Sequence, residues 1–321
     1  MLACQVRKSE LYCLIKMKRI VTHKASDLDA IASSWIIKKF LPGWDNAVID
    51  FVPAGSKFKG TYTKEGEAIE VVDGAEVIHT DTGMGPLDHH QTNDDNVCAT
   101  SRAFDYVLEN GSPIAKNPQK KEALRRMVDY VIDDDHFQEV FYQNPMTETY
   151  DFSIVSLIHG IKLQYPKDDA TCLRFGHDMM DAAYHYFENK IWAEEEIKEK
   201  GIKFETRWGK GIAIETLNDT VLKHAQQVGY VISVRKDPAT NSIRIKARPK
   251  RRSGKFFPKG VYEDVDVDLT PVYEKLKKMD PDATWYNHVS GRMLLNGSTK
   301  NPEMNGTKLT LEQVVEVLKS I

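Results

Sequence analysis

The first 150 residues alternate short β-branched runs with amphipathic helical patterns, and this alternation restricts the possible fold more than any other feature. Strand-like runs cover 19–22, 48–52 and 76–80, and helical patterns cover 30–40, 101–109 and 120–132. Such alternation is typical of a parallel sheet covered by helices. We therefore expect an α/β fold whose N-terminal domain, over 17–165, is built on a parallel sheet.

The second half of the chain changes pattern twice. A long, charged helical pattern runs from about 168 to 200, and we interpret 166–203 as a linking helix. Strand-like runs then follow at 212–217, 230–234 and 242–247, with helical patterns beginning near 270 and 311. A chain of 321 residues is long enough for two cores. The sequence predicts a smaller α/β C-terminal domain over 204–321.

Charge and cysteine content exclude several classes of protein. The chain has 44 Lys+Arg against 47 Asp+Glu, so it lacks the broad basic surface that holds long duplexes, and any nucleic-acid contact must come from a local patch. Its four cysteines are scattered without C-x-x-C spacing, which indicates reduced thiols and a cytoplasmic protein. We find no apolar run long enough for a membrane span, and we expect 1–16 to be either a dispensable tail or the product of an upstream start.

Acidic and histidine residues follow two of the predicted strands. His23, Asp27 and Asp29 come directly after the first strand, and Asp81 follows the third. Ligands of open α/β sheets bind beyond the carboxyl ends of the strands, where these side chains would meet. An isolated D-x-D is usually a solvated turn or a cap. Several such groups at strand ends of one domain indicate a metal site instead.

A third group, Asp88-His89-His90, lies seven residues beyond Asp81. Mixed histidine and aspartate ligands favour manganese, cobalt, zinc or magnesium over calcium, which prefers oxygen ligands alone. Two such ions about 3.5–4 Å apart would support in-line phosphoryl transfer to water. The set therefore predicts the hydrolysis of phosphate esters.

These motifs together resemble the DHH phosphoesterase superfamily. It includes RecJ-type exonucleases, oligoribonucleases, cyclic-dinucleotide phosphodiesterases and manganese-dependent inorganic pyrophosphatases. Within it, segments 77–83, 87–91 and 40–44 look most like the melanocyte-proliferating-gene-like exonuclease group and its microbial relatives. That group often has glutamate at the position of Asp29, whereas pyrophosphatases and RecJ-type enzymes have aspartate.

The resemblance implies a role for each residue of the site. Two divalent cations, most expected to be Mn²⁺ with Mg²⁺, Co²⁺ or Zn²⁺ as alternatives, would share Asp81. The ligands implied are His23, Asp27 and Asp81 for one ion, and Asp29, Asp81, His89 and an aspartate of 131–136 for the other. For this last ligand we expect Asp133, with Asp134 as the alternative. His90 would contact the substrate phosphate, and Asp88 would orient a histidine.

Two segments of the C-terminal domain are candidates for substrate binding. Segment 246–259 has seven basic residues and no acid, among them Lys250, Arg251 and Arg252, and could hold phosphate or be a solvated loop. Segment 285–298 resembles a divergent form of the superfamily's glycine-rich GGGH-like motif. That resemblance implies His288 and Arg292 as substrate contacts, against the alternative of a buried histidine and a surface arginine.

The leading hypothesis is a two-metal phosphoesterase that hydrolyses phosphodiester bonds of short single-stranded oligonucleotides or small nucleotides. The first alternative is a manganese-dependent inorganic pyrophosphatase or small-phosphate hydrolase. The second is a non-catalytic nucleotide-binding protein. The expected partners are the substrate itself and no membrane, and a homodimer is compatible with the sequence.

Overall fold

The structure is a computed structural model that describes residues 17–60, 66–250, 265–298 and 300–321. The chain is mixed α/β and divides into two compact units, Met1–Tyr184 and His185–Ile321. The boundary falls inside α6 (Asp169–Lys200), a continuous helix of 32 residues. Among the residues described, no helix is both long enough and apolar enough to cross a membrane.

The first unit contains a four-stranded sheet in the order β2-β1-β4-β3. Its strands are β1 (Lys18–His23), β2 (Val48–Val52), β3 (Ile69–Val72) and β4 (Ala75–His79). β1 is parallel to both β2 and β4, as predicted, but β3 pairs antiparallel with β4. The sequence prediction missed β3. Its signal was Asp73-Gly74, whose positive φ angles of 49° and 79° suit a tight hairpin turn.

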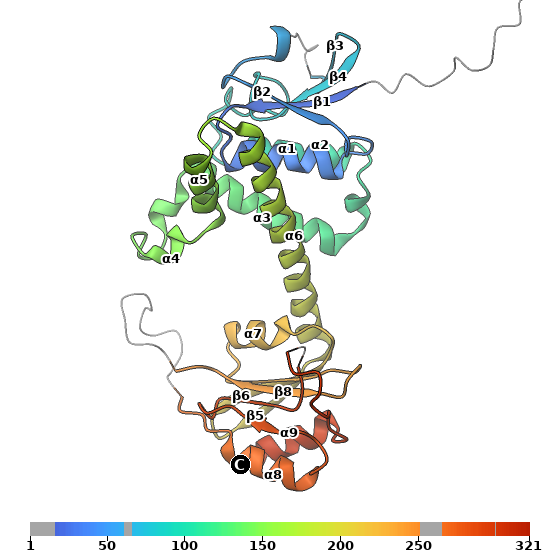
Figure 1. Cartoon of the computed structure of the whole chain (residues 1–321), viewed down its shortest axis with the longest axis vertical. Helices are drawn as coiled ribbons and strands as arrows, with labels where there is room; N and C mark the ends of the chain where they lie inside the picture. Colours follow the sequence, from blue (N-terminus) through green and yellow to red (C-terminus); the bar gives the residue numbers. More distant parts are fainter. Residues whose placement is uncertain (1–16, 61–65, 251–264, 299) are drawn as a thin grey trace, which may run out of the picture. The chain divides into compact units, whose positions relative to one another are not determined.

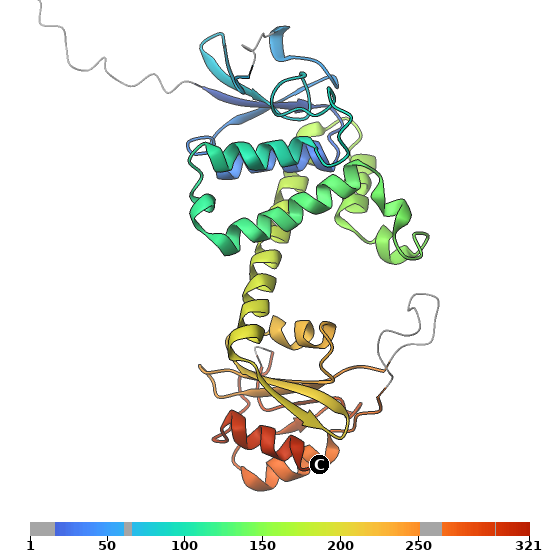
Figure 2. The same ribbon diagram turned by 180° about the vertical axis from the view of Figure 1, so that it is seen from behind.

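Three helices pack against one another on one side of this sheet: α1 (Leu28–Phe40), α2 (Ala99–Glu109) and α3 (Pro118–Asp135). Figures 1 and 2 show α1 and α2 side by side beneath the strands. α1 is buried at every position from Leu28 to Ile37, including two serines. Because it is enclosed on all sides, the residues at its N-terminus have fixed positions, and these include the D-x-D motif.

The remaining elements of the first unit are shorter. They are η1 (Phe58–Gly60), η2 (Pro113–Lys116), η3 (Gln138–Phe141), α4 (Glu148–Asp151) and α5 (Ile154–Gln164). The opposite face of the sheet carries a small apolar cluster of Val21, Val52 and Val77, covered in part by Phe58. Both faces are therefore covered, as expected for a sheet with parallel strands.

The second unit contains a six-stranded sheet in the order β5-β6-β7-β8-β10-β9. The strands are β5 (Ile202–Thr206), β6 (Gly209–Glu215), β7 (Ile232–Lys236), β8 (Ile243–Ala247), β9 (Tyr286–Asn287) and β10 (Met293–Leu295). Only β6 and β7 run parallel among the pairs described, so this sheet is mostly antiparallel. The three strands predicted here correspond to β6, β7 and β8.

Helices cover both faces of this second sheet. α7 (Thr220–Gln227) packs with Ala193 and Ile197 of α6 over β6, while α8 (Thr270–Met279) and α9 (Leu311–Lys319) enclose the larger core. Residues 265–269, which alternate like a strand in the sequence, form none. Asp268 instead accepts a hydrogen bond from the Thr270 N–H at the start of α8.

Candidate metal centre

Asp81 lies at the middle of the site because of sheet register. β1 and β4 are parallel with Val21 opposite His79, so His23 and Asp81 each lie two residues beyond a paired position. The backbone turns sharply at Asp81, with a φ of 55°, and its carboxylate is buried. Oδ2 lies 3.1 Å from His23 Nε2, and Oδ1 lies 3.5 Å from His89 Nε2. One carboxylate therefore faces two groups of ligands.

His23 and Asp27 form the group on one side of Asp81. His23 Nδ1 donates to the Lys24 carbonyl at 2.8 Å, which directs Nε2 towards Asp81 and, at 3.5 Å, towards Asp27. Asp27 is the N-cap of α1, where its other oxygen accepts the Ala30 N–H at 3.0 Å. Ligand atoms of His23, Asp27 and Asp81 lie within 4.8 Å of one another, close enough to share one cation.

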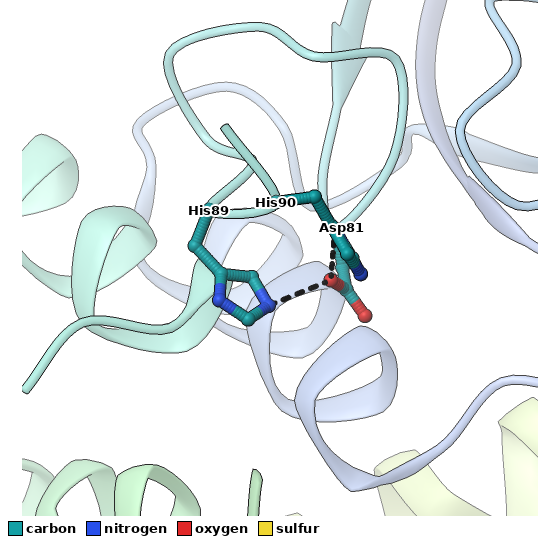
Figure 3. Close-up of side chains that lie close together, drawn as sticks. All are labelled: Asp81, His89 and His90. Atoms are coloured by element: carbon teal, nitrogen blue, oxygen red, sulfur yellow. Dashed lines mark ion pairs between the residues drawn. The ribbon is translucent and has the colours of Figure 1, made fainter. Parts of the chain in front are cut away.

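His89 is the centre of the group on the other side. Its Nε2 lies 3.5 Å from carboxylate oxygens of Asp29, Asp81 and Asp135 alike. Figure 3 shows that His89 and His90 both face the same oxygen of the Asp81 carboxylate. A ring nitrogen surrounded by three carboxylates is a donor set that suits a divalent cation.

Asp29 is held in this group by a helix N-terminus. Its two oxygens accept the backbone N–H groups of Ala99 at 2.8 Å and Thr100 at 2.7 Å, at the start of α2. The first-turn amides of a helix favour a negative charge. The same carboxylate thus stabilises α2 and faces His89.

The pKa values reflect crowding of negative charge. Burial lowers the pKa of His23, but its hydrogen bonds to the Asp27 and Asp81 carboxylates outweigh burial and raise the pKa to about 11. Burial, followed by the charges of Asp81 and Asp135, raises the pKa of Asp29 to about 7. The long contact between His89 Nε2 and Asp81 Oδ1, at 3.5 Å, is the main cause that raises the pKa of His89 to about 9.

A second observation fits bound cations. Asp81 Oδ1 is buried and makes no hydrogen bond of normal geometry among the described residues, because His89 Nε2 lies 3.5 Å away and His90 Nδ1 lies 3.7 Å away. An unpaired buried carboxylate oxygen is costly, and a cation between it and His89 would satisfy it. The residues present can therefore hold a metal ion.

The structure brings Asp135 of α3 close to His89, whereas the predicted Asp133 and Asp134 are in none of the described His/Asp groups that could hold an ion. Asp133 is exposed and lies two residues, about 200° of helical rotation, from Asp135. Asp129, one turn before Asp133 on the same helical face, is also exposed and pairs with Arg125. The buried stripe of α3 was the better signal, because Val131 is buried and Asp135 lies four residues further.

His136 was also missed. It follows Asp135, and its Nε2 donates to the Val97 carbonyl at 3.1 Å, just before the start of α2. It thereby joins the end of α3 to the segment whose amides hold Asp29. Ligand atoms of His89, Asp135 and His136 lie within 4.8 Å of one another.

Asp88 and His90 form a hydrogen-bonded pair beside Asp81. Asp88 is fully buried, and one oxygen accepts the Met84 N–H at 2.7 Å. The other accepts His90 Nδ1–H at 2.7 Å and the His90 backbone N–H at 3.2 Å. Burial raises the pKa of Asp88, but the hydrogen bonds from His90 outweigh it and lower the pKa. Asp88 has the contact expected of an orienting residue, and it leaves His90 Nε2 for a ligand.

The predicted substrate residues of the second unit make internal contacts. Arg292 donates to the Arg248 carbonyl at 2.9 Å and to Asp266 at 2.7 Å, and Lys250 also pairs with Asp266 at 2.9 Å. His288 Nδ1 accepts the Ser290 N–H at 3.1 Å. The geometry of Arg292 is that of a structural residue, because its guanidinium is already paired within the unit. Arg251 and Arg252 lie outside the described residues.

Comparisons with known proteins add little. No protein-family profile matches the chain, and no curated protein matches it. One similar solved structure is an uncharacterized protein from Helicobacter pylori G27, with 12% identity and a TM-score of 0.24, covering 95% of this chain and 100% of that one. A likeness at this TM-score supports no conclusion about function.

Proposed function

We propose that this chain is a phosphoesterase that depends on two divalent cations. The position of Asp81 supports this proposal most strongly, because its two oxygens face separate His/Asp groups from one buried point. The ligands in this proposal are His23, Asp27 and Asp81 for one ion and Asp29, Asp81, His89 and Asp135 for the other.

Mn²⁺ is the proposed cation, with Mg²⁺, Co²⁺ and Zn²⁺ as alternatives, because the donors are mixed nitrogen and oxygen. When bound, the ions would supply positive charge for a phosphoryl group during displacement. Three carboxylates have defined positions in this site. Backbone N–H groups at helix N-termini donate to Asp27 and Asp29, and Asp81 follows the end of β4.

His90 is the proposed proton donor to the leaving oxygen. Asp88 holds Nδ1–H, so proton exchange would take place at Nε2. The ring is half-exposed, as a residue that meets a substrate must be. Asp88 is therefore a positioning residue in this proposal, and the ring it orients is the catalytic one.

The proposed substrates are phosphodiester bonds of short single-stranded oligonucleotides or small nucleotides. The support is the resemblance of segments 77–83 and 87–91 to the exonuclease group, together with the basic segment that includes Lys250. Inorganic pyrophosphate is the second candidate. It is favoured by Asp29, which pyrophosphatases share, and by the internal pairing of Arg292.

A substrate panel tests both. Wild-type protein, His89→Ala and His185→Ala would each be incubated with Mn²⁺ and one of four substrates: short RNA oligomers, short DNA oligomers, dinucleotides or pyrophosphate. His185 is the control, because it is an exposed histidine of α6. We expect oligomer cleavage that His89→Ala lowers by at least about 100-fold and His185→Ala leaves unchanged. Phosphate release from pyrophosphate alone would favour the alternative. If protein saturated with Mn²⁺ hydrolysed none of these substrates, the proposal that it is a phosphoesterase would be refuted.

A further inference from the structure

Exposed apolar side chains concentrate in one segment of the first unit. Nine of the 21 large apolar residues exposed in the described residues fall between Phe137 and Tyr165. The nine are Phe137, Val140, Phe141, Met146, Tyr150, Phe152, Leu157, Leu163 and Tyr165. Figures 1 and 2 both show α4 and α5, which belong to this segment, projecting at the side of the unit beyond α3. Scattered surface leucines need no explanation, but a concentration of this kind marks an interaction site.

α5 shows the same imbalance within a single helix. It is rich in isoleucine, leucine and valine, yet Ile158 is its only fully buried residue. A helix that is apolar on most sides is normally enclosed by other elements. Here much of that surface, including Leu157 and Leu163, faces solvent.

The charge of the segment disfavours a polyanion as the partner. Between 137 and 165 the sequence has Glu139, Glu148 and Asp151 against a single lysine, Lys162. A nucleic acid or an anionic membrane would be repelled by such a surface. Phenylalanine, tyrosine and methionine are the residues enriched at the buried centres of protein–protein interfaces.

The area available matches a stable dimer. Five aromatic side chains of the segment are 37–87% exposed, and at about 150–250 Å² each they present on the order of 470–790 Å². Met146, at 94% exposure, and Leu163, at 84%, add to this. A standard interface buries about 800 Å² on each partner.

We propose that segment 137–165 is the interface of a homodimer. The partner is a second copy of this chain, because most soluble oligomers are two-fold homodimers and the exposed apolar area is about what one partner buries in a standard interface. The segment begins one residue after His136 and two after Asp135, so the interface borders the candidate metal centre.

Light scattering coupled to size-exclusion chromatography of the full chain tests this. We expect wild type to have twice the mass of one chain at micromolar concentration. The double variant Phe141→Ser/Phe152→Ser removes two exposed aromatic anchors and should weaken dimerisation by at least about 100-fold, since interface anchors commonly contribute more than tenfold each. Val289→Ser, an exposed apolar residue of the second unit, is the matched control and should remain dimeric.

Three results would overturn the proposal: a monomeric wild type at every concentration, a double variant that still dimerises, or a control variant that dissociates equally. Circular dichroism separates dissociation from unfolding, because the three side chains changed are exposed and each variant should keep the wild-type spectrum. The test reads mass alone, so its outcome is independent of whether the chain hydrolyses phosphate esters.

Discussion

Asp88→Ala should destabilise the first unit strongly. The buried carboxylate accepts three hydrogen bonds, from the Met84 N–H, the His90 N–H and His90 Nδ1. Bonds to a charged acceptor contribute about 1.5–3 kcal/mol each, and removing the desolvated charge recovers part of that sum. We expect a net loss of about 3–5 kcal/mol, a large share of the usual ~5–15 kcal/mol of a domain. Urea unfolding of the metal-free protein measures it.

Asp88→Asn is the sharper variant. The amide keeps the shape and one acceptor, so it should cost only about 1–2 kcal/mol. The amide oxygen would face His90, where it can accept both the backbone N–H and Nδ1–H, and Nδ2 would oppose the Met84 N–H. The neutral amide would no longer stabilise a positive charge on the His90 ring. If His90 donates a proton from Nε2 and depends on that charge stabilisation, kcat should fall by about 10²–10⁴ while Mn²⁺ affinity stays within a few-fold of wild type.

Wild-type kcat in Asp88→Asn would refute the role assigned to the pair. A parallel loss of Mn²⁺ affinity, measured by calorimetry, would place Asp88 among the residues that shape the ligand groups instead. The chemical shifts of the His90 ring nitrogens report the hydrogen bond at Nδ1 directly, and an unchanged Nδ1 shift in Asp88→Asn would contradict the geometry itself.

Three further predictions follow from the candidate centre. Because the folded-state pKa values of His23 and His89 are raised to about 11 and about 9, the stability they contribute without metal is present below pH 6.5 and lost as the pH rises through 9. Thermal unfolding in chelator should therefore shift downwards from pH 7 to 10, and a flat profile would contradict it. Asp135→Asn should lower Mn²⁺ affinity at least tenfold, about 1.4 kcal/mol, whereas Asp133→Asn should leave it within twofold. Equal losses of Mn²⁺ affinity in the two variants, measured by calorimetry, would refute Asp135 as the proposed ligand from α3. Lys162→Gln removes the ammonium that donates at 3.2 Å to the carbonyls of residues 25 and 26, and should cost about 1–2 kcal/mol in urea unfolding.

Much of the first unit could be predicted because its signals are local. Each β-branched run is continuous in sequence, and the strand ends carry the side chains that converge. β3 was missed because a four-residue edge strand is too short to show a clear alternation of apolar and polar residues. Its sequence signal is the Asp73-Gly74 turn that follows it. In the second unit, Arg292 could not be assigned from sequence, since its pairing with Asp266 joins residues 26 apart.

The sequence by itself determined the donor set, namely the histidines and aspartates that follow β1 and β4, because residue type and spacing along a strand end are local properties. Only the tertiary structure decided which of three adjacent aspartates faces His89. That choice depends on the rotation of α3, which is set by burial of Val131 and its neighbours against the other helices. The register of β1 against β4 brings His23 and Asp81 together across 58 residues, through hydrogen bonds between distant strands that no local pattern specifies.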